Sequence, residues 1–353
     1  MALHSDLLDF TRKTLIAVGI AAAAWLIIMV VIKTFDVLLV VFAGILLGVF
    51  MRGAGNAITR YTHLPVVASM IVAWLTLIAA IVVVPWLFGP NVATDLNNLF
   101  EQIPKSIERL RQWTGDWGWA QQALNQLSHS GSRLTSTILR NAMGIFSTLL
   151  GALSSFLLML VLGLYFSFTP GIYVAGLIKL VPRSRRDRGC EVLTVAGHTL
   201  FGWVLARIVA VVSVGALSYA GLLLLGVQQP ATLAAIAGAF TFVPYLGPIV
   251  SAVPAILIAL GQYPMLGLYV VFLYLLVHLA EGYFITPYVE WRFISMPPAL
   301  VLSAQVLMGL GSGIIGVMLA SPLVVVIRVL AELLYVRDAL HDEKVPLNPK
   351  LHQ

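Results

Sequence analysis

Long apolar runs separated by short polar segments dominate the chain. A helix needs about 20 mostly apolar residues to cross a bilayer, and eight runs are close to this length or longer. They cover residues 14–32, 35–51, 66–88, 143–168, 204–226, 231–260, 265–286 and 298–335. Backbone in lipid must satisfy its own hydrogen bonds, which a helix does within one segment. The pattern therefore predicts an all-α polytopic membrane protein with about eight transmembrane segments.

The first run has a second interpretation as a signal peptide. Arg12 and Lys13 precede it, and the small residues Ala21–Ala24 resemble a cleavage region. The apolar run continues through Val31, beyond the place where cleavage would occur. We therefore expect a retained span.

Composition and charge agree with a membrane protein. Hydrophobic residues make up 60% of the chain and charged residues 10%, whereas soluble domains carry about 25% charged residues. The formal charge of +6 is spread over loops, so we expect no nucleic-acid partner. Short loops rich in Lys and Arg stay cytoplasmic, and the densest group is Arg183–Arg188. We expect a multi-pass protein of the bacterial inner membrane with both termini in the cytoplasm and the lipid bilayer as its partner.

Two of the apolar segments are predicted to be broken. The run 231–260 is interrupted by Pro244-Tyr245-Leu246-Gly247-Pro248, and the run 298–335 by Gly309-Leu310-Gly311-Ser312-Gly313. Proline removes a backbone donor and clashes with the preceding helical turn. The prolines at 230 and 254 are 24 residues apart, as are those at 298 and 322, which suggests an internal duplication. Each broken segment either spans the membrane or folds back as a re-entrant hairpin of two half-helices.

A long polar insert at residues 90–142 separates the third and fourth spans. An apolar stripe within it predicts an amphipathic helix that lies on the bilayer surface or packs on a neighbouring subunit. The stripe contains Leu96, Leu99, Ile103, Ile107 and Leu110. The predicted divisions are spans at 1–89, the insert at 90–142, a span and basic loop at 143–198, a core with both broken segments at 199–336, and a tail at 337–353.

Several short motifs resemble the autoinducer-2 exporter family of bacterial membrane proteins. They are Leu225-Gly226-Val227, Phe242-Val243-Pro244-Tyr245-Leu246-Gly247-Pro248-Ile249, Ala252-Val253-Pro254-Ala255, Ala280-Glu281-Gly282-Tyr283, Thr286-Pro287, Pro297-Pro298-Ala299-Leu300, Gln305 and Ala320-Ser321-Pro322-Leu323. The resemblance implies an oligomeric carrier or channel-like exporter. The family's named substrate is a small polyhydroxylated quorum-sensing signal, and other relatives are associated with exchange of sodium or lithium for protons. Trp203 stands where family members often carry glutamine, which weakens the transfer of substrate identity.

The break at Pro244–Pro248 is the predicted centre of a substrate pathway. A half-helix ending near Val243 has free carbonyls, and one starting near Ile249 has free amides. Together they suit a small polar solute or, at the carbonyl end, a cation. The alternative is a kinked helix whose free groups are satisfied by neighbours. The candidate pathway residues are Thr241, Pro244, Tyr245, Gly247, Pro248, Ser251, Gln305, Gly311, Ser312 and Gly313.

Glu281 and His278 are candidate coupling residues. They lie three residues apart and share one helical face. An acid within a membrane span usually faces protein or water and often has a function, so Glu281 is expected to exchange protons or cations. The alternatives are an interfacial acid at Glu281 and a structural histidine at His278. Arg207, early in its span, is expected to snorkel to the cytoplasmic interface, and binding of an anionic substrate is the alternative.

Signatures of enzymes and cofactor sites are poor in this sequence. His278 and Glu281 have the spacing H-x-x-E, which differs from the H-E-x-x-H of zinc proteases, and no phosphate-binding loop occurs. The lone Cys190 forms no internal disulfide and no structural metal site. We expect no catalytic residue, no metal and no cofactor.

Three functions remain open from the sequence. The first is export of a small polar solute such as an autoinducer-2-like signal, driven by an ion, proton or solute gradient. The second is sodium or lithium exchange for protons. The third, of another class, is a membrane scaffold without transport that acts through the insert 90–142. A homo-oligomer is expected.

Overall fold

The computed structural model describes residues 2–114, 142–285 and 296–340, and within these ranges it contains helices and no strand. The α-helices are α1 (Ala2–Thr62), α2 (Val66–Thr114), α4 (Ala142–Phe168), α5 (Pro170–Lys179), α6 (Arg186–Leu224), α7 (Pro230–Thr241), α8 (Leu246–Gln262), α9 (Pro264–Ala280) and α11 (Pro298–Leu330). A 3-10 turn, η1 (Arg183–Arg185), and two π-helical segments, η2 (Glu281–Ile285) and η3 (Ala331–Arg337), complete the set. The all-α polytopic class is confirmed.

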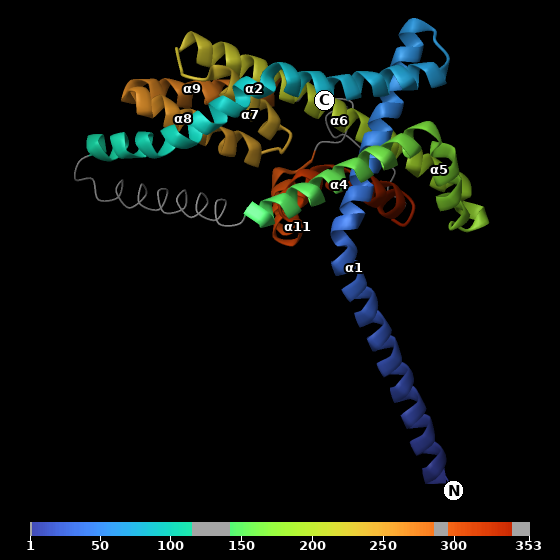
Figure 1. The fold of residues 1–353 in the computed structure, drawn as a ribbon. Helices are drawn as coiled ribbons and strands as arrows, with labels where there is room; N and C mark the ends of the chain where they lie inside the picture. Colours follow the sequence, from blue (N-terminus) through green and yellow to red (C-terminus); the bar gives the residue numbers. More distant parts are fainter. Residues whose placement is uncertain (1, 115–141, 286–295, 341–353) are drawn as a thin grey trace.

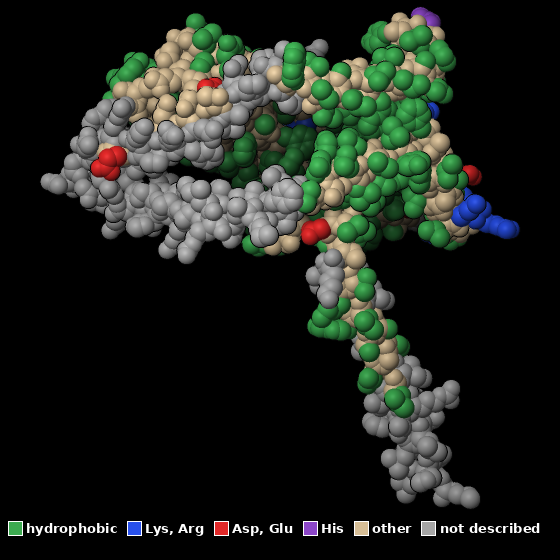
Figure 2. Space-filling model, viewed as in Figure 1, with side chains coloured by type: hydrophobic (Ala, Val, Ile, Leu, Met, Phe, Trp, Pro, Cys, Tyr) green, Lys and Arg blue, Asp and Glu red, His purple; other side chains and the backbone are tan. Residues whose placement is uncertain are grey.

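Six helical segments in the described part of the chain are long and apolar enough to cross a membrane. They are Thr34–Thr62, Val66–Val83, Leu150–Phe168, Arg183–Leu224, Pro264–Tyr283 and Pro298–Arg337, whereas α7 and α8 are shorter apolar helices. Figure 2 shows apolar side chains over much of the visible described surface and few charged ones. This distribution suits contact with lipid.

The first two predicted spans lie on one helix. α1 is continuous over 61 residues, which corresponds to a length of about 90 Å. The residues between the two runs, Lys33 and Thr34, are not helix breakers, and the Thr34 hydroxyl donates to the carbonyl of Val30 at 2.7 Å. The prediction of separate spans at 14–32 and 35–51 is therefore replaced by a single helix. Its N-terminal part projects away from the other helices (Figure 1).

Small residues let α1 and α4 pack closely. A Cβ atom on Gly44 would lie 2.7 Å from Cβ of Leu162, and one on Gly48 would lie 2.7 Å from Cβ of Phe166. These two glycines are four residues apart and share a face, as in other membrane helix pairs with small residues at this spacing. The close approach joins the N-terminal helix to the fourth predicted span.

α7 and α8 form the first hairpin, which packs against α6 and α9. Leu233 and Ala237 of α7 belong to one buried cluster with Ala255 and Ile258 of α8, together with Val214 of α6 and further residues of α6 and α9. These two arms have 12 and 17 residues, fewer than the about 20 needed to cross a bilayer. The first broken segment is therefore a hairpin of two helices, each too short to cross a bilayer by itself.

The first half of the polar insert is part of α2 and packs on this hairpin. The hydroxyl of Thr232, at the start of α7, donates to Oδ2 of Asp95 at 2.7 Å. Ser106 is buried against Gly261 of α8. Asp95 and Ser106 therefore contact the first hairpin within the chain, whereas the side chains of the predicted apolar stripe lie outside those that the structure describes. Residues 115–141 of the insert lie outside the described residues, as does the tail from residue 341.

Candidate functional site

The first break is a tight reversal at Pro244-Tyr245-Leu246. The amide of Leu246 donates to the carbonyl of Pro244 at 2.8 Å, and that of Gly247 donates to the carbonyl of Val243 at 3.0 Å. Tyr245 has φ 65° and ψ −51°, which is the rare and strained form of a γ-turn. The amides of Leu246 and Gly247 are therefore used by the turn, which corrects the expectation that the amides opening α8 are free.

Glycine is required at position 247 by a close backbone approach. A Cβ atom there would collide with the carbonyl oxygen of Phe240. Because the colliding atom belongs to the backbone of α7, no side-chain rotation relieves the clash. Gly247 thus permits the arms of the first hairpin to meet closely at the break.

The second break is also a hairpin. α11 is interrupted at Ser312 (φ −128°, ψ 18°) and Gly313 (φ 59°, ψ −140°). Nε2 of Gln305 in the first arm lies 3.3 Å from Oγ of Ser321 in the second arm. On a straight helix, residues 16 positions apart would be separated by about 24 Å. The arms 298–311 and 314–330 therefore fold back on each other.

Gln305 connects the two hairpins. Its Nε2 also donates to the carbonyl of Pro244 at 3.0 Å, and the residue is fully buried. This one buried side-chain amide therefore contacts both the first break and the second arm of its own hairpin. Its Oε1 has no hydrogen-bond donor among the described residues, which leaves a buried acceptor beside the break.

A small cavity of about 40 Å³ adjoins this contact. Its lining residues are Trp203, Arg207, Pro244, Tyr245, Met296 and Val301. The ring of Trp203 meets Phe242 edge to face, with centroids 5.8 Å apart, and the Arg207 guanidinium lies 6.0 Å from the centroid of the Trp203 ring. The break therefore borders a space whose lining includes a tryptophan, an arginine and two residues of the turn.

A row of ionisable side chains leads from the cavity toward the end of α9. Nη1 of Arg207 lies 4.0 Å from Oε1 of Glu281, and Nδ1 of His278 lies 3.2 Å from Oε2 of the same carboxylate. Arg207 and Glu281 are both buried. Glu281 is thus buried and held between two nitrogen-bearing groups.

The other predicted pathway residues have different positions. The hydroxyl of Thr241 donates to the carbonyl of Ala237 at 2.7 Å, and that of Ser251 donates to the carbonyl of Pro248 at 3.2 Å. Both hydroxyls therefore bond to their own helices. The tip of the second hairpin is formed by Gly311, Ser312 and Gly313, which do not line the cavity. The residue of this hairpin that contacts the first break is Gln305, which lies within the first arm.

Sequence reasoning missed the role of Arg207. It was expected to snorkel to the interface, but the structure buries it beside Glu281. One signal could have found the pair: residues 192–289 contain a single acid, Glu281, and a single Lys or Arg, Arg207. Charges within membrane spans usually pair with one another. Met296, Val301 and Ser321 had no comparable signal, because apolar residues and serine are common throughout these segments.

Comparison with known proteins matches this chain to a transporter family and to candidate transport proteins. Residues 15–335 match the model of a family described as AI-2E family transporter. Two candidate transport proteins of Bacillus subtilis are similar to this chain. YueF is 22% identical over 302 residues, covering 81% of this chain and 80% of its own; YrrI is 29% identical over 151 residues, covering 43% of each chain. A candidate transport protein of Mycobacterium tuberculosis is 25% identical over 237 residues, covering 65% of this chain and 64% of its own.

Proposed function

The chain belongs to the AI-2E transporter family, and on this premise we propose that it moves a small polar solute between its two hairpins. The observation that carries the proposal is the contact of Gln305 with the carbonyl of Pro244 beside the cavity. Broken helices near the midplane are typical of transport sites, because their backbone groups can bind solutes. The solute we propose is an autoinducer-2-like signal or a related metabolite, exported down a gradient from the cell.

In the proposed mechanism this conformation is a closed state. Its volume of about 40 Å³ has room for a few water molecules, since one water needs at least about 10–15 Å³ of such space. A sugar-sized solute requires more. Passage therefore requires the hairpins to separate, which breaks the Gln305 contact and exposes Nε2 and Oε1 of the amide to solute hydroxyl groups.

Glu281 is the coupling residue in this proposal, assisted by His278. The carboxylate stabilises the buried charge of Arg207, which lies in the cavity wall. A proton or cation that binds Glu281 weakens this attraction, because opposite charges interact strongly in a medium of low dielectric constant. Ion binding can therefore change the position of a cavity residue, which is what gradient-driven transport requires.

Transport by the full chain in sealed vesicles tests the proposal. Gln305→Ala and Glu281→Gln are expected to reduce solute flux while the protein remains folded, whereas Ser303→Ala is the matched control on the same arm, since Ser303 is exposed and bonds to its own helix. Loss of the gene is expected to raise the intracellular signal. Unchanged signal together with unchanged flux in both variants would exclude export by this site.

A sodium or lithium exchange for protons is the second candidate, favoured by the arrangement of Arg207, Glu281 and His278. It predicts that added sodium collapses a pH gradient in everted vesicles and that Glu281→Gln abolishes the collapse. A scaffold acting through the insert 90–142 is the third. The contacts of Asp95 and Ser106 with the first hairpin give that segment a role within the chain instead.

We also propose inner-membrane residence with both termini in the cytoplasm and assembly as a homo-oligomer. The basic loop around Arg183–Arg188 supports this orientation. Exposed apolar side chains on α1, among them Leu15, Trp25 and Leu26, suit either lipid or a second copy. Cross-linking in native membranes distinguishes these two environments.

A further inference from the structure

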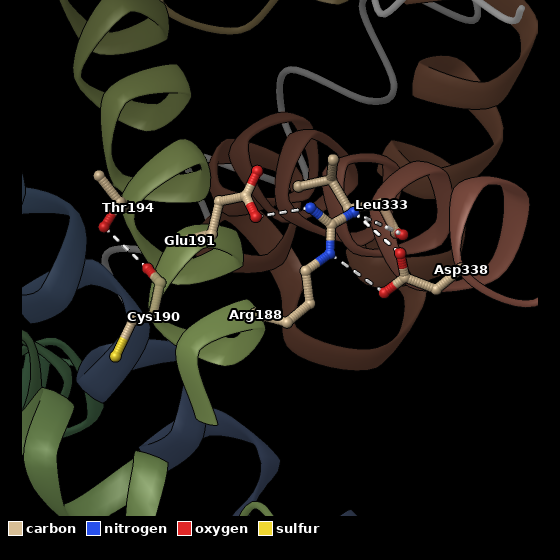
Figure 3. Close-up of polar contacts among 6 residues, drawn as sticks. All are labelled: Arg188, Cys190, Glu191, Thr194, Leu333 and Asp338. Carbon is tan, nitrogen blue, oxygen red and sulfur yellow. Dashed lines mark hydrogen bonds and ion pairs between the residues drawn. The ribbon is translucent and has the colours of Figure 1, made fainter. Parts of the chain in front are cut away.

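The basic segment after α5 contains two kinds of arginine. Arg188 is held by three side-chain bonds: its Nη1 contacts Glu191 at 2.7 Å, and its Nη2 and Nε contact the two carboxylate oxygens of Asp338 at 2.9 and 3.2 Å (Figure 3). This arrangement ties the start of α6 to the residue that follows η3. Nε of Arg186 donates to the carbonyl of Val181 at 3.3 Å. These two arginines are structural.

Three other cations, Lys179 at the end of α5 and two arginines after it, have no such structural role. Lys179, Arg183 and Arg185 are exposed, and none of their side chains forms a hydrogen bond or ion pair in the part of the chain that the structure describes. Asp187 is the acidic residue nearest to them in sequence. The group therefore keeps a net positive charge that the protein itself does not neutralise.

Apolar side chains lie beside these cations. α5 has no buried residue. Its Ile172 and Leu177 are exposed by 70% and 54%, and Leu180, which caps its end, is exposed by 82%. Tyr173, Leu177 and Leu180 follow the spacing of one helical face. Figure 2 shows Lys and Arg side chains beside apolar ones at the edge of the molecule where Figure 1 places α5.

The position of α5 in the chain places this surface at the membrane interface. The span Leu150–Phe168 ends just before α5, and the next span candidate begins at Arg183. A short helix between two spans lies at one face of the bilayer, where exposed apolar side chains enter the acyl boundary and cations reach the headgroups. Lys and Arg near the cytoplasmic leaflet attract its anionic lipids.

We propose that α5 and η1 form a binding surface for anionic phospholipid headgroups, with Lys179, Arg183 and Arg185 as the cations and Leu177 and Leu180 as the apolar anchor. The surface does not depend on the proposed solute pathway. It is fixed relative to the C-terminal helix by the Arg188 contacts with Asp338. Lipid bound there would hold the α4–α6 connection at a defined depth.

The test compares the full chain in detergent with added phosphatidylglycerol or phosphatidylcholine, followed by native mass spectrometry of retained lipid. The wild type is expected to prefer phosphatidylglycerol. Each cation is expected to contribute about five-fold to that preference, so Lys179→Gln/Arg183→Gln/Arg185→Gln should remove it. The charge-conserving triple variant Lys179→Arg/Arg183→Lys/Arg185→Lys is the matched control and should retain it.

Two further results decide the proposal. Arg188→Gln should lower thermal stability and keep the lipid preference, which separates lipid binding from folding. A fluorescent label on Leu180→Cys, in a Cys190→Ser background, should be quenched by brominated lipid more than a label on Tyr61→Cys. Three results would each overturn a lipid surface. They are a glutamine triple variant that still prefers phosphatidylglycerol, a label at position 180 that brominated lipid does not quench, and a rise in thermal stability with inorganic phosphate equal to that with phosphatidylglycerol.

Discussion

Gln305 and Ser321 lie 16 residues apart on α11, yet Nε2 of the first is 3.3 Å from Oγ of the second. The contact shows that the last long apolar segment reverses at Ser312 and Gly313 and does not continue as one rod. It also brings the same amide to Pro244 of the other hairpin. Three segments therefore meet at one side chain, beside the cavity.

Chemical cross-linking should detect the reversal in α11. In a Cys190→Ser background, Gln305→Cys/Ser321→Cys is expected to react with a short bifunctional thiol reagent within one chain, because a straight helix would separate these positions by about 24 Å. Gln305→Cys/Tyr335→Cys is the control and should remain unlinked. Equal reaction of both pairs would contradict the folded arrangement.

Removal of the Gln305 amide should loosen the contact between the hairpins. Gln305→Ala is expected to lower the free energy of unfolding by about 1–3 kcal/mol, because it deletes the two hydrogen bonds of a buried side-chain amide. Ser303→Ala, on the exposed side of the same arm, should change it little. Unfolding in detergent, followed by circular dichroism, measures both, and an equal loss in the two variants would argue against a specific contact.

The tight approach at Gly247 predicts a strong effect of one methyl group. Gly247→Ala should destabilise the protein by about 3 kcal/mol through collision with the backbone of α7. Gly197→Ala on α6, where a Cβ atom would meet nothing within 4 Å, should be neutral or slightly stabilising. Thermal unfolding compares the two variants, and a tolerated Gly247→Ala would show that the turn can widen.

The positive φ of Tyr245 can be tested with a matched pair of substitutions. Tyr245→Ala and Tyr245→Gly both remove the ring, so the difference between them reports backbone strain. The glycine variant is expected to be more stable than the alanine variant by about 1–2 kcal/mol, since glycine adopts left-handed φ without steric cost. Chemical denaturation of the two variants measures this difference in the free energy of unfolding. A more stable alanine variant would refute strain at this position.

Arg207 and Glu281 should behave as a coupled pair. Arg207→Met and Glu281→Gln are each expected to destabilise the protein by about 3 kcal/mol, because each leaves the other charge buried. The double variant should lose less than the sum of the two by at least about 1 kcal/mol. A double-mutant cycle of unfolding free energies measures this, and strict additivity would mean that their contact of 4.0 Å carries no energy.

Local chemistry in the sequence determined the class of the protein and the positions of its breaks. Apolar runs near the length of a bilayer require helices. The two prolines around Gly247 and the three glycines at 309–313 each disfavour a continuous helix at these places. α7 begins at Pro230 and α11 at Pro298, whereas the second proline of each equally spaced pair, Pro254 or Pro322, lies inside a helix. The same local reasoning predicted two separate helices at the first two runs, but Lys33 and Thr34 interrupt the apolar pattern without ending the helix.

Tertiary structure alone decided which of these residues meet. Gln305 is 61 positions from Pro244, and α6 carries Arg207 to Glu281 at the end of α9. Such contacts depend on how hairpins pack against neighbouring helices, and packing is set by side-chain shape over distant segments rather than by local propensity. The sequence therefore predicted that the backbone breaks within two apolar segments. Only the fold determined that the side chain in contact with the first break is the buried Gln305 and not a residue of the second glycine turn.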